Sequence, residues 1–139
     1  MIGKLLDWLR HARRMRTWNP AHAAGRRGED LAHRFLRRQG FVIVARNYRL
    51  ASGDAEADLI AWEGGNLVVV EVKSRESGDY GPPERAIGAE KHRHMLRVAR
   101  EYARKTDTPF GLVRFDVVTV VMGKPPEIGL IRNAWKPEQ

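Results

Sequence analysis

The stretch EADLIAWEGGNLVVVEVK, residues 56–73, contains two strand-like segments on either side of Gly64-Gly65. An apolar run, a two-glycine turn and a Val-rich run together predict an antiparallel β-hairpin. If the two glycines are the central turn residues, Asp58 lies directly opposite Glu71. The hairpin therefore places two acidic side chains across from each other near its open end.

In the same register Glu56 lies opposite Lys73, and side chains alternate along a strand. The four charged residues then share one face with an apolar set, namely Ile60, Trp62, Leu67 and Val69. Carboxylates that oppose each other across a ladder repel, and burial makes the repulsion worse unless a cation or a shared proton relieves it. A hard divalent cation suits such oxygen ligands, and Lys73 could orient a water or neutralise developing charge beside it. The other interpretation is a strand end with solvated charges, because a one-residue slip in register would separate the acids.

An Asp on one strand followed by Glu-x-Lys on the next resembles the PD-(D/E)xK nuclease superfamily. A longer ordered set of residues is more closely similar to the YraN-like uncharacterised protein family, and it covers about residues 25–135. The matching residues are Gly28-Glu29, the Gly53–Ile60 segment, Val70-Glu71-Val72-Lys73-Ser74-Arg75, Gly81-Pro82, Ala86, Lys91, the Arg114–Val118 strand and Asn133-Ala134. One departure is Asp54-Ala55, because the family more often has Gly immediately before the Glu at position 56. This difference lengthens the loop that leads into the 55–62 strand and leaves Glu56 and Asp58 in place.

The resemblance implies a site that holds Mg²⁺ or Mn²⁺. Asp58 and Glu71 would be ligands together with the Val72 carbonyl, and Glu56 would complete the acidic shell. Lys73 would position the attacking water.

Two residues on helices have alternative interpretations. In the resolvase-like branch of the superfamily a Glu on the first core helix joins the metal site, and Glu29 matches it; the alternative is that Glu29 pairs with Arg26 or His33. Lys91 resembles the family's helix Lys, which would reach the scissile phosphate. Its alternative role is a snorkelling stem on an apolar stripe.

The composition indicates one domain and a basic leading segment. With 139 residues, no cysteine and no apolar run long enough to span a bilayer, we expect a cytoplasmic protein. Residues 1–50 contain 12 of the 25 Lys and Arg but only 3 of the 17 acids. This asymmetry predicts a polyanionic partner held near the acidic site, although a basic solvated surface would have the same composition. Candidate nucleic-acid contacts are Arg26, Arg27, Arg49, Arg75 and Lys91.

Residues 1–19 predict a basic amphipathic helix, and residues 20–139 a single α/β domain. The expected elements of the domain are a helix at 21–39, strands at 41–49, 55–62 and 66–74, a helix at 84–105, and strands at 110–121 and 128–135. The second helix would carry the chain over in a right-handed crossover, so that the 110–121 strand lies parallel to the 66–74 strand. The resemblance implies the same architecture, a restriction-endonuclease-like three-layer sandwich with a mixed central sheet flanked by helices.

The function hypothesis is metal-dependent hydrolysis of nucleic-acid phosphodiesters, with DNA, including branched DNA, as substrate. Resolvase-type nucleases act as pairs on symmetric substrates, and this analogy favours a homodimer. The alternative is a protein of a different class, a nucleic-acid-binding or scaffolding protein on a nuclease-like fold that does not turn over substrate.

Overall fold

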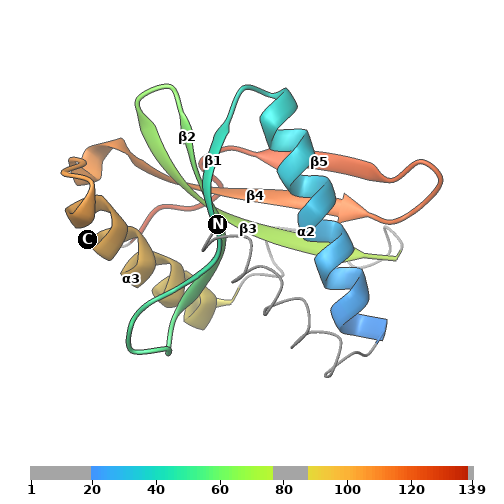
Figure 1. The fold of residues 1–139 in the computed structure, drawn as a ribbon, viewed down its shortest axis with the longest axis horizontal. Helices are drawn as coiled ribbons and strands as arrows, with labels where there is room; N and C mark the ends of the chain where they lie inside the picture. The colour runs from blue at the N-terminus through green and yellow to red at the C-terminus, as the bar shows by residue number, and fades with distance from the viewer. Residues whose placement is uncertain (1–19, 77–87, 138–139) are drawn as a thin grey trace, which may run out of the picture.

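The computed structural model describes residues 20–76 and 88–137, which form two α-helices and a five-stranded sheet (Figure 1). The predicted helix at residues 1–19 lies outside the described residues. In chain order the elements are α2 (Pro20–Arg38), β1 (Val42–Arg49), β2 (Glu56–Glu63), β3 (Asn66–Arg75), α3 (Ala89–Lys105), η2 (Phe110–Leu112), β4 (Val113–Val121) and β5 (Glu127–Ile131). Neither described helix is long and apolar enough to cross a membrane.

The sheet is mixed, and its strands lie in the order β1-β2-β3-β4-β5. All neighbouring pairs are antiparallel except β3 and β4, which are parallel. The parallel pair follows the α3 crossover, as the sequence predicts. β3 is therefore the central strand, which explains its continuous apolar run from Leu67 to Val70.

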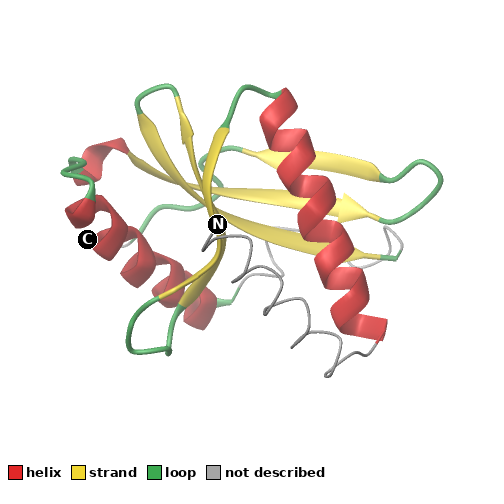
Figure 2. Cartoon of the chain, viewed as in Figure 1, coloured by secondary structure: helices red, strands yellow, loops and turns green. Residues whose placement is uncertain are grey.

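The helices cover opposite faces of this sheet (Figure 2). Val68 and Val70 pack in the core cluster that contains Ala32 and Leu36 of α2. Leu67 and Val69, which alternate with them on β3, pack instead against the buried side of α3. The architecture is the predicted three-layer α/β sandwich.

The hairpin between β2 and β3 has the predicted register. Glu63 pairs with Asn66, and the ladder continues to Leu59 opposite Val70. Gly64 has φ +59°, a conformation that favours glycine at a tight hairpin turn. Pairing ends at Leu59 and Val70 although both strands continue, so the open end of the hairpin is free to form a site.

Three predicted boundaries are wrong. α3 begins at Ala89, because Gly88 at its N-cap is extended (φ −79°, ψ 167°); residues 84–87 lie outside the described residues. The strand predicted from Phe110 begins at Val113, after a 3₁₀ turn. The closing strand ends at Ile131 rather than near Trp135, because the chain turns at Asn133 (φ +53°).

Asp116 of β4 is fully buried and has a structural role. Arg114 Nε and Nη2 donate to its two carboxylate oxygens at 2.9 and 2.8 Å, and the main-chain N–H of Asn133 donates to Oδ1 at 2.9 Å. Arg114 Nη2 also lies 2.6 Å from Glu63 Oε1, and Arg132 lies 2.7 Å from Glu63 Oε2. This charged network ties the β2–β3 turn to β4 and to the segment after β5.

α2 packs closely on β3 at a glycine. A Cβ built on Gly28 would lie 2.9 Å from the Ser74 Cβ and 1.7 Å from its Oγ. The Oγ can rotate away, but the Ser74 Cβ cannot. Gly28 therefore allows α2 to lie close to the end of β3, next to Glu71 and Lys73.

We expect Gly28→Ala to destabilise the protein by about 1–2 kcal/mol, since overpacking typically costs about 1–3 kcal/mol and the gain in helix propensity returns up to about 1. Gly25→Ala, in the same helix, is the matched control because a Cβ there meets nothing within 4 Å. It should leave stability unchanged or raise it slightly. Urea unfolding of the two variants measures both effects, and equal stabilities would contradict the close approach.

Candidate metal and nuclease site

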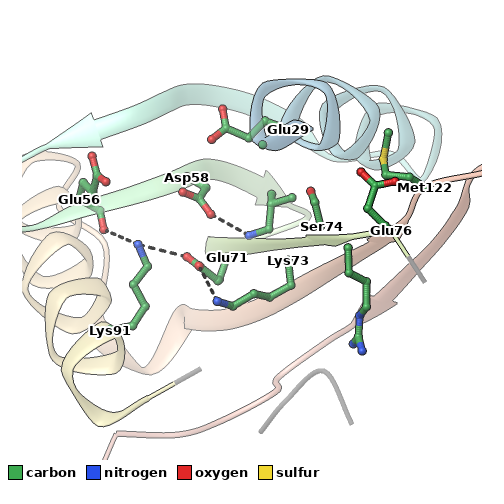
Figure 3. Close-up of a pocket in the computed structure, with 12 residues that line it drawn as sticks. Glu29, Glu56, Asp58, Glu71, Lys73, Ser74, Glu76, Lys91 and Met122 are labelled. Carbon is green, nitrogen blue, oxygen red and sulfur yellow. Dashed lines mark hydrogen bonds and ion pairs between the residues drawn. The ribbon is translucent and has the colours of Figure 1, made fainter. Parts of the chain in front are cut away.

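A pocket of about 690 Å³ opens where β2 and β3 cease to pair (Figure 3). α2 and α3 each contribute residues to it, so the pocket lies between the two outer layers at one end of the sheet. Its lining residues are Gly25, Glu29, Glu56, Asp58, Glu71, Val72, Lys73, Ser74, Arg75, Glu76, Lys91 and Met122.

Asp58 and Glu71 point into this pocket side by side, as the hairpin register predicts (Figure 3). Asp58 Oδ2 accepts a hydrogen bond of 2.8 Å from the main-chain N–H of Val72. This bond takes the place of the next step of the β2–β3 ladder and holds the Asp58 carboxylate against β3. Glu71 is buried, with only 7% of its side chain exposed.

Two lysines approach the Glu71 carboxylate. Lys91 Nζ, from α3, lies 3.2 Å from Glu71 Oε2 and donates to the main-chain carbonyl of Glu56 at 3.4 Å. Lys73 Nζ, from the same strand as Glu71, lies 4.0 Å from Oε1. Oε2 is buried, and its ion pair with Lys91 provides no well-aligned hydrogen bond. Glu71 Oε2 therefore retains the capacity to bind a metal ion.

Burial and the neighbouring Asp58 carboxylate raise the pKa of Glu71 to about 8, although Lys91 opposes this shift. Burial alone would lower the pKa of Lys91, but Glu71 and Asp58 outweigh it and the net shift is upward. Near neutral pH Lys91 therefore keeps its charge while Glu71 is largely protonated. A cation entering the pocket would take the place of that proton.

A raised pKa for Glu71 makes the protein less stable as pH rises. An unfolded Glu loses its proton near pH 4.5, whereas folded Glu71 keeps its proton to about pH 8. Between these values the folded state binds more protons, so the free energy of unfolding falls with increasing pH. We expect Glu71→Gln to remove this part of the pH dependence in urea unfolding without metal at pH 5 to 9. An unchanged slope in the variant would show that Glu71 ionises normally.

The other two predicted acids have partners of their own. Glu29 lines the pocket from α2, but Asn47 Nδ2 donates to its Oε2 at 3.3 Å and Arg46 Nη2 lies 3.7 Å from the same oxygen. Glu56 Oε2 accepts from Arg49 Nε at 3.0 Å. The structure brings both acids to the edge of the pocket, with each carboxylate directed to a cation of β1.

The five residues predicted to contact nucleic acid lie in different parts of the structure, and they differ in exposure. Arg27 is exposed on α2 and Arg26 is partly buried beside it. Arg49 is exposed at the end of β1 and is held by Glu56. Arg75 lines the pocket at the end of β3. Lys91 differs from these, because it lies inside the pocket as the counterion of Glu71 when that carboxyl is ionised.

Several residues of the site were missed by sequence reasoning. In sequence, neither Arg46 nor Asn47 carries a signal of a role beside Glu29. Asn47 has φ +50°, an uncommon backbone conformation within a strand, and only the structure shows this. Ser74, Glu76 and Met122 also line the pocket.

The sequence matches a known protein family. Residues 28–120 match the uncharacterised protein family UPF0102. The chain belongs to this family. The matched range starts at the close approach of α2 to β3 and ends within β4, so the UPF0102 match contains both strands that carry the acidic pair.

Relatives with the same family name align over most of their length. A UPF0102 protein of Solibacter usitatus is 48% identical over 135 residues, covering 97% of this chain and all of the relative. One from Koribacter versatilis is 44% identical over 120 residues, covering 84% and 82% of the two chains. One from Desulfosudis oleivorans is 42% identical over 117 residues, covering 84% and 93%. The resemblance to the YraN-like family is thereby confirmed, and these names state no activity.

Proposed function

We propose that this UPF0102 protein is a divalent-metal-dependent nuclease that hydrolyses phosphodiester bonds in DNA. The observation that carries the proposal is the convergence of Asp58 and buried Glu71 in one pocket, with Lys73 beside them. Two carboxylates placed together away from water are unfavourable as a structural feature, so they need a ligand or a proton. Their arrangement also supports placement in the PD-(D/E)xK superfamily.

The residues present fit Mg²⁺ or Mn²⁺. Carboxylate oxygens of Asp58 and Glu71 and the Val72 carbonyl would hold the ion, with water and phosphate at its other positions. The buried Glu71 Oε2 lies 3.2 Å from Lys91 Nζ without a well-aligned hydrogen bond, so it has capacity for a ligand bond. Within residues 20–76 and 88–137 no three His, Cys, Asp or Glu side chains are grouped so that they could hold a metal ion, so the proposed site has two carboxylate ligands. A bound divalent ion would lower the pKa of water and neutralise charge on the phosphate.

The chain's own residues would then orient the reactants. The Val72 N–H fixes one oxygen of Asp58, leaving the other directed to the pocket. Lys73, with a third of its side chain exposed, can donate to an attacking water or to a phosphate oxygen. Lys91 stabilises ionised Glu71 and holds α3 against the end of β2.

Glu29 and Glu56 remain candidates for the outer part of the acidic site. Each would have to exchange its present cation, Arg46 or Arg49, to contact an ion or a metal-bound water. Such an exchange would free an arginine for the substrate phosphate. Arg26, Arg27 and Arg75 would contribute further phosphate contacts around the pocket. A cytoplasmic location and a homodimer that acts on symmetric branched DNA are part of the same proposal.

The test is incubation of the full chain with linear, nicked and four-way DNA in the presence of Mg²⁺ or Mn²⁺. We expect metal-dependent cleavage of at least one substrate and none in EDTA. A non-catalytic binding protein would instead show affinity that falls steeply with salt and no cleavage of any of the three.

A further inference from the structure

α3 carries four arginines on one line along its surface. Arg93, Arg97, Arg100 and Arg104 are spaced i, i+4, i+7 and i+11, so they lie above one another on the same side of the helix. All four are exposed. We call this line the arginine ridge. The helix side that faces the sheet is apolar and buried, through Met95, Val98, Ala99 and Ala103.

Few of the ridge guanidinium groups have a partner among the described residues. Arg97 Nη1 is paired with Asp54 Oδ2 at 2.9 Å, and Arg100 lies 6.0 Å from the Phe110 ring centroid. Arg93 and Arg104 have no ion-pair partner in the described parts of the chain. Like charges one turn apart destabilise a helix by a few tenths of a kcal/mol per pair. The ridge therefore has a small energetic cost and uncompensated charge directed to solvent.

The arginine ridge begins at the end of α3 that contributes Lys91 to the pocket. Lys91 reaches the pocket from the first turn of α3 (Figure 3). Arg93 lies at the same end of the helix but about 200° around it, on the outer side. The remaining arginines continue away from the pocket toward the end of α3. Eleven residues of helix rise about 16 Å, which corresponds to about five steps of a nucleic-acid strand at 3.4 Å each.

We propose that the arginine ridge binds the phosphate backbone of a nucleic-acid duplex that runs along the outer side of α3. This proposal takes its ligand class from the proposed function, but it concerns binding and not turnover. Guanidinium groups bind phosphate oxygens in a bidentate manner, and the ridge contains arginine without lysine. An anionic membrane surface is a weaker fit, because a helix that lies on a membrane inserts its apolar side, and that side of α3 is buried in the core.

The experiment compares two double variants that remove the same charge. Arg93→Gln/Arg104→Gln removes the two unpaired ridge arginines, and Lys124→Gln/Lys136→Gln removes two exposed cations elsewhere. Binding of a fluorescein-labelled DNA duplex to each full-length protein is followed by anisotropy over a range of salt concentrations in EDTA. We expect the ridge variant to lose about 2 from the magnitude of the slope of log K against log salt, and at least tenfold in affinity at low salt. The Lys variant should retain the wild-type slope.

Equal changes in both variants, or no change in the ridge variant, would overturn the proposal. So would binding of the ridge to phosphatidylglycerol vesicles in preference to the duplex. Because EDTA removes the metal, the result is independent of cleavage. A protein that binds through the ridge but never cuts DNA would refute the nuclease and leave the ridge assignment intact.

Discussion

Glu71→Gln is expected to lower the rate of metal-dependent DNA cleavage by about 10³-fold, the order of effect seen when a principal electrostatic group is removed from an active site. Gln keeps the size of the side chain but has no charge with which to hold a cation. Asp58→Asn should have a similar effect, because Asn provides one oxygen and can retain the Val72 contact only in one orientation of its amide. Single-turnover assays on the best substrate of the wild-type protein measure both variants.

Glu76→Gln is the matched control for this prediction. Glu76 also lines the pocket and carries the same charge, but it is exposed at the end of β3. Its variant should cleave within a few-fold of the wild-type rate. If all three variants lose activity equally, the effect belongs to the overall negative charge of the pocket and not to the Asp58–Glu71 pair.

Arg114→Met is expected to destabilise the fold by about 3–5 kcal/mol, because it leaves the fully buried Asp116 without its main cation. Arg132→Met is the control, since Arg132 contacts the same Glu63 from a side chain that is 48% exposed. An exposed pair of this kind typically contributes about 1 kcal/mol or less. Chemical unfolding of the two variants at neutral pH measures the difference in their free energies of unfolding. Similar losses of stability in both variants would show that the burial of Asp116 does not set the cost of breaking the network.

Turn residues and hydrophobic periodicity predict the helices and strands of the domain well. The glycine pair and the alternating pattern of residues 56–73 determine the register of β2 with β3, and hence which acids meet. Errors arise where one residue interrupts a favourable pattern. Gly88 has no side chain that signals an extended conformation, so helical periodicity alone predicts that the helix runs through it. Trp135 looks like a strand residue in sequence, but in the structure its ring stacks between Phe115 and His92.

The chemistry of the site depends more on tertiary packing. The pairing of Asp58 with Glu71 follows from the hairpin, whereas the counterion of Glu71 comes from α3, 20 residues later in the chain. The partners of Glu29 also lie on a separate element, and no local periodicity relates Asn47 to a helix 18 residues earlier. The raised pKa of Glu71 arises from the combined burial by both layers and the proximity of Asp58.

An anomalous difference map from crystals soaked in Mn²⁺ would show whether Asp58 and Glu71 together hold one divalent ion. We predict a single strong peak between the two carboxylates and the Val72 carbonyl, absent from crystals of Glu71→Gln under the same soak. A saturating soak that leaves this position empty, or that places manganese elsewhere with Lys91 still bound to Glu71, would show that the two carboxylates do not hold a divalent ion.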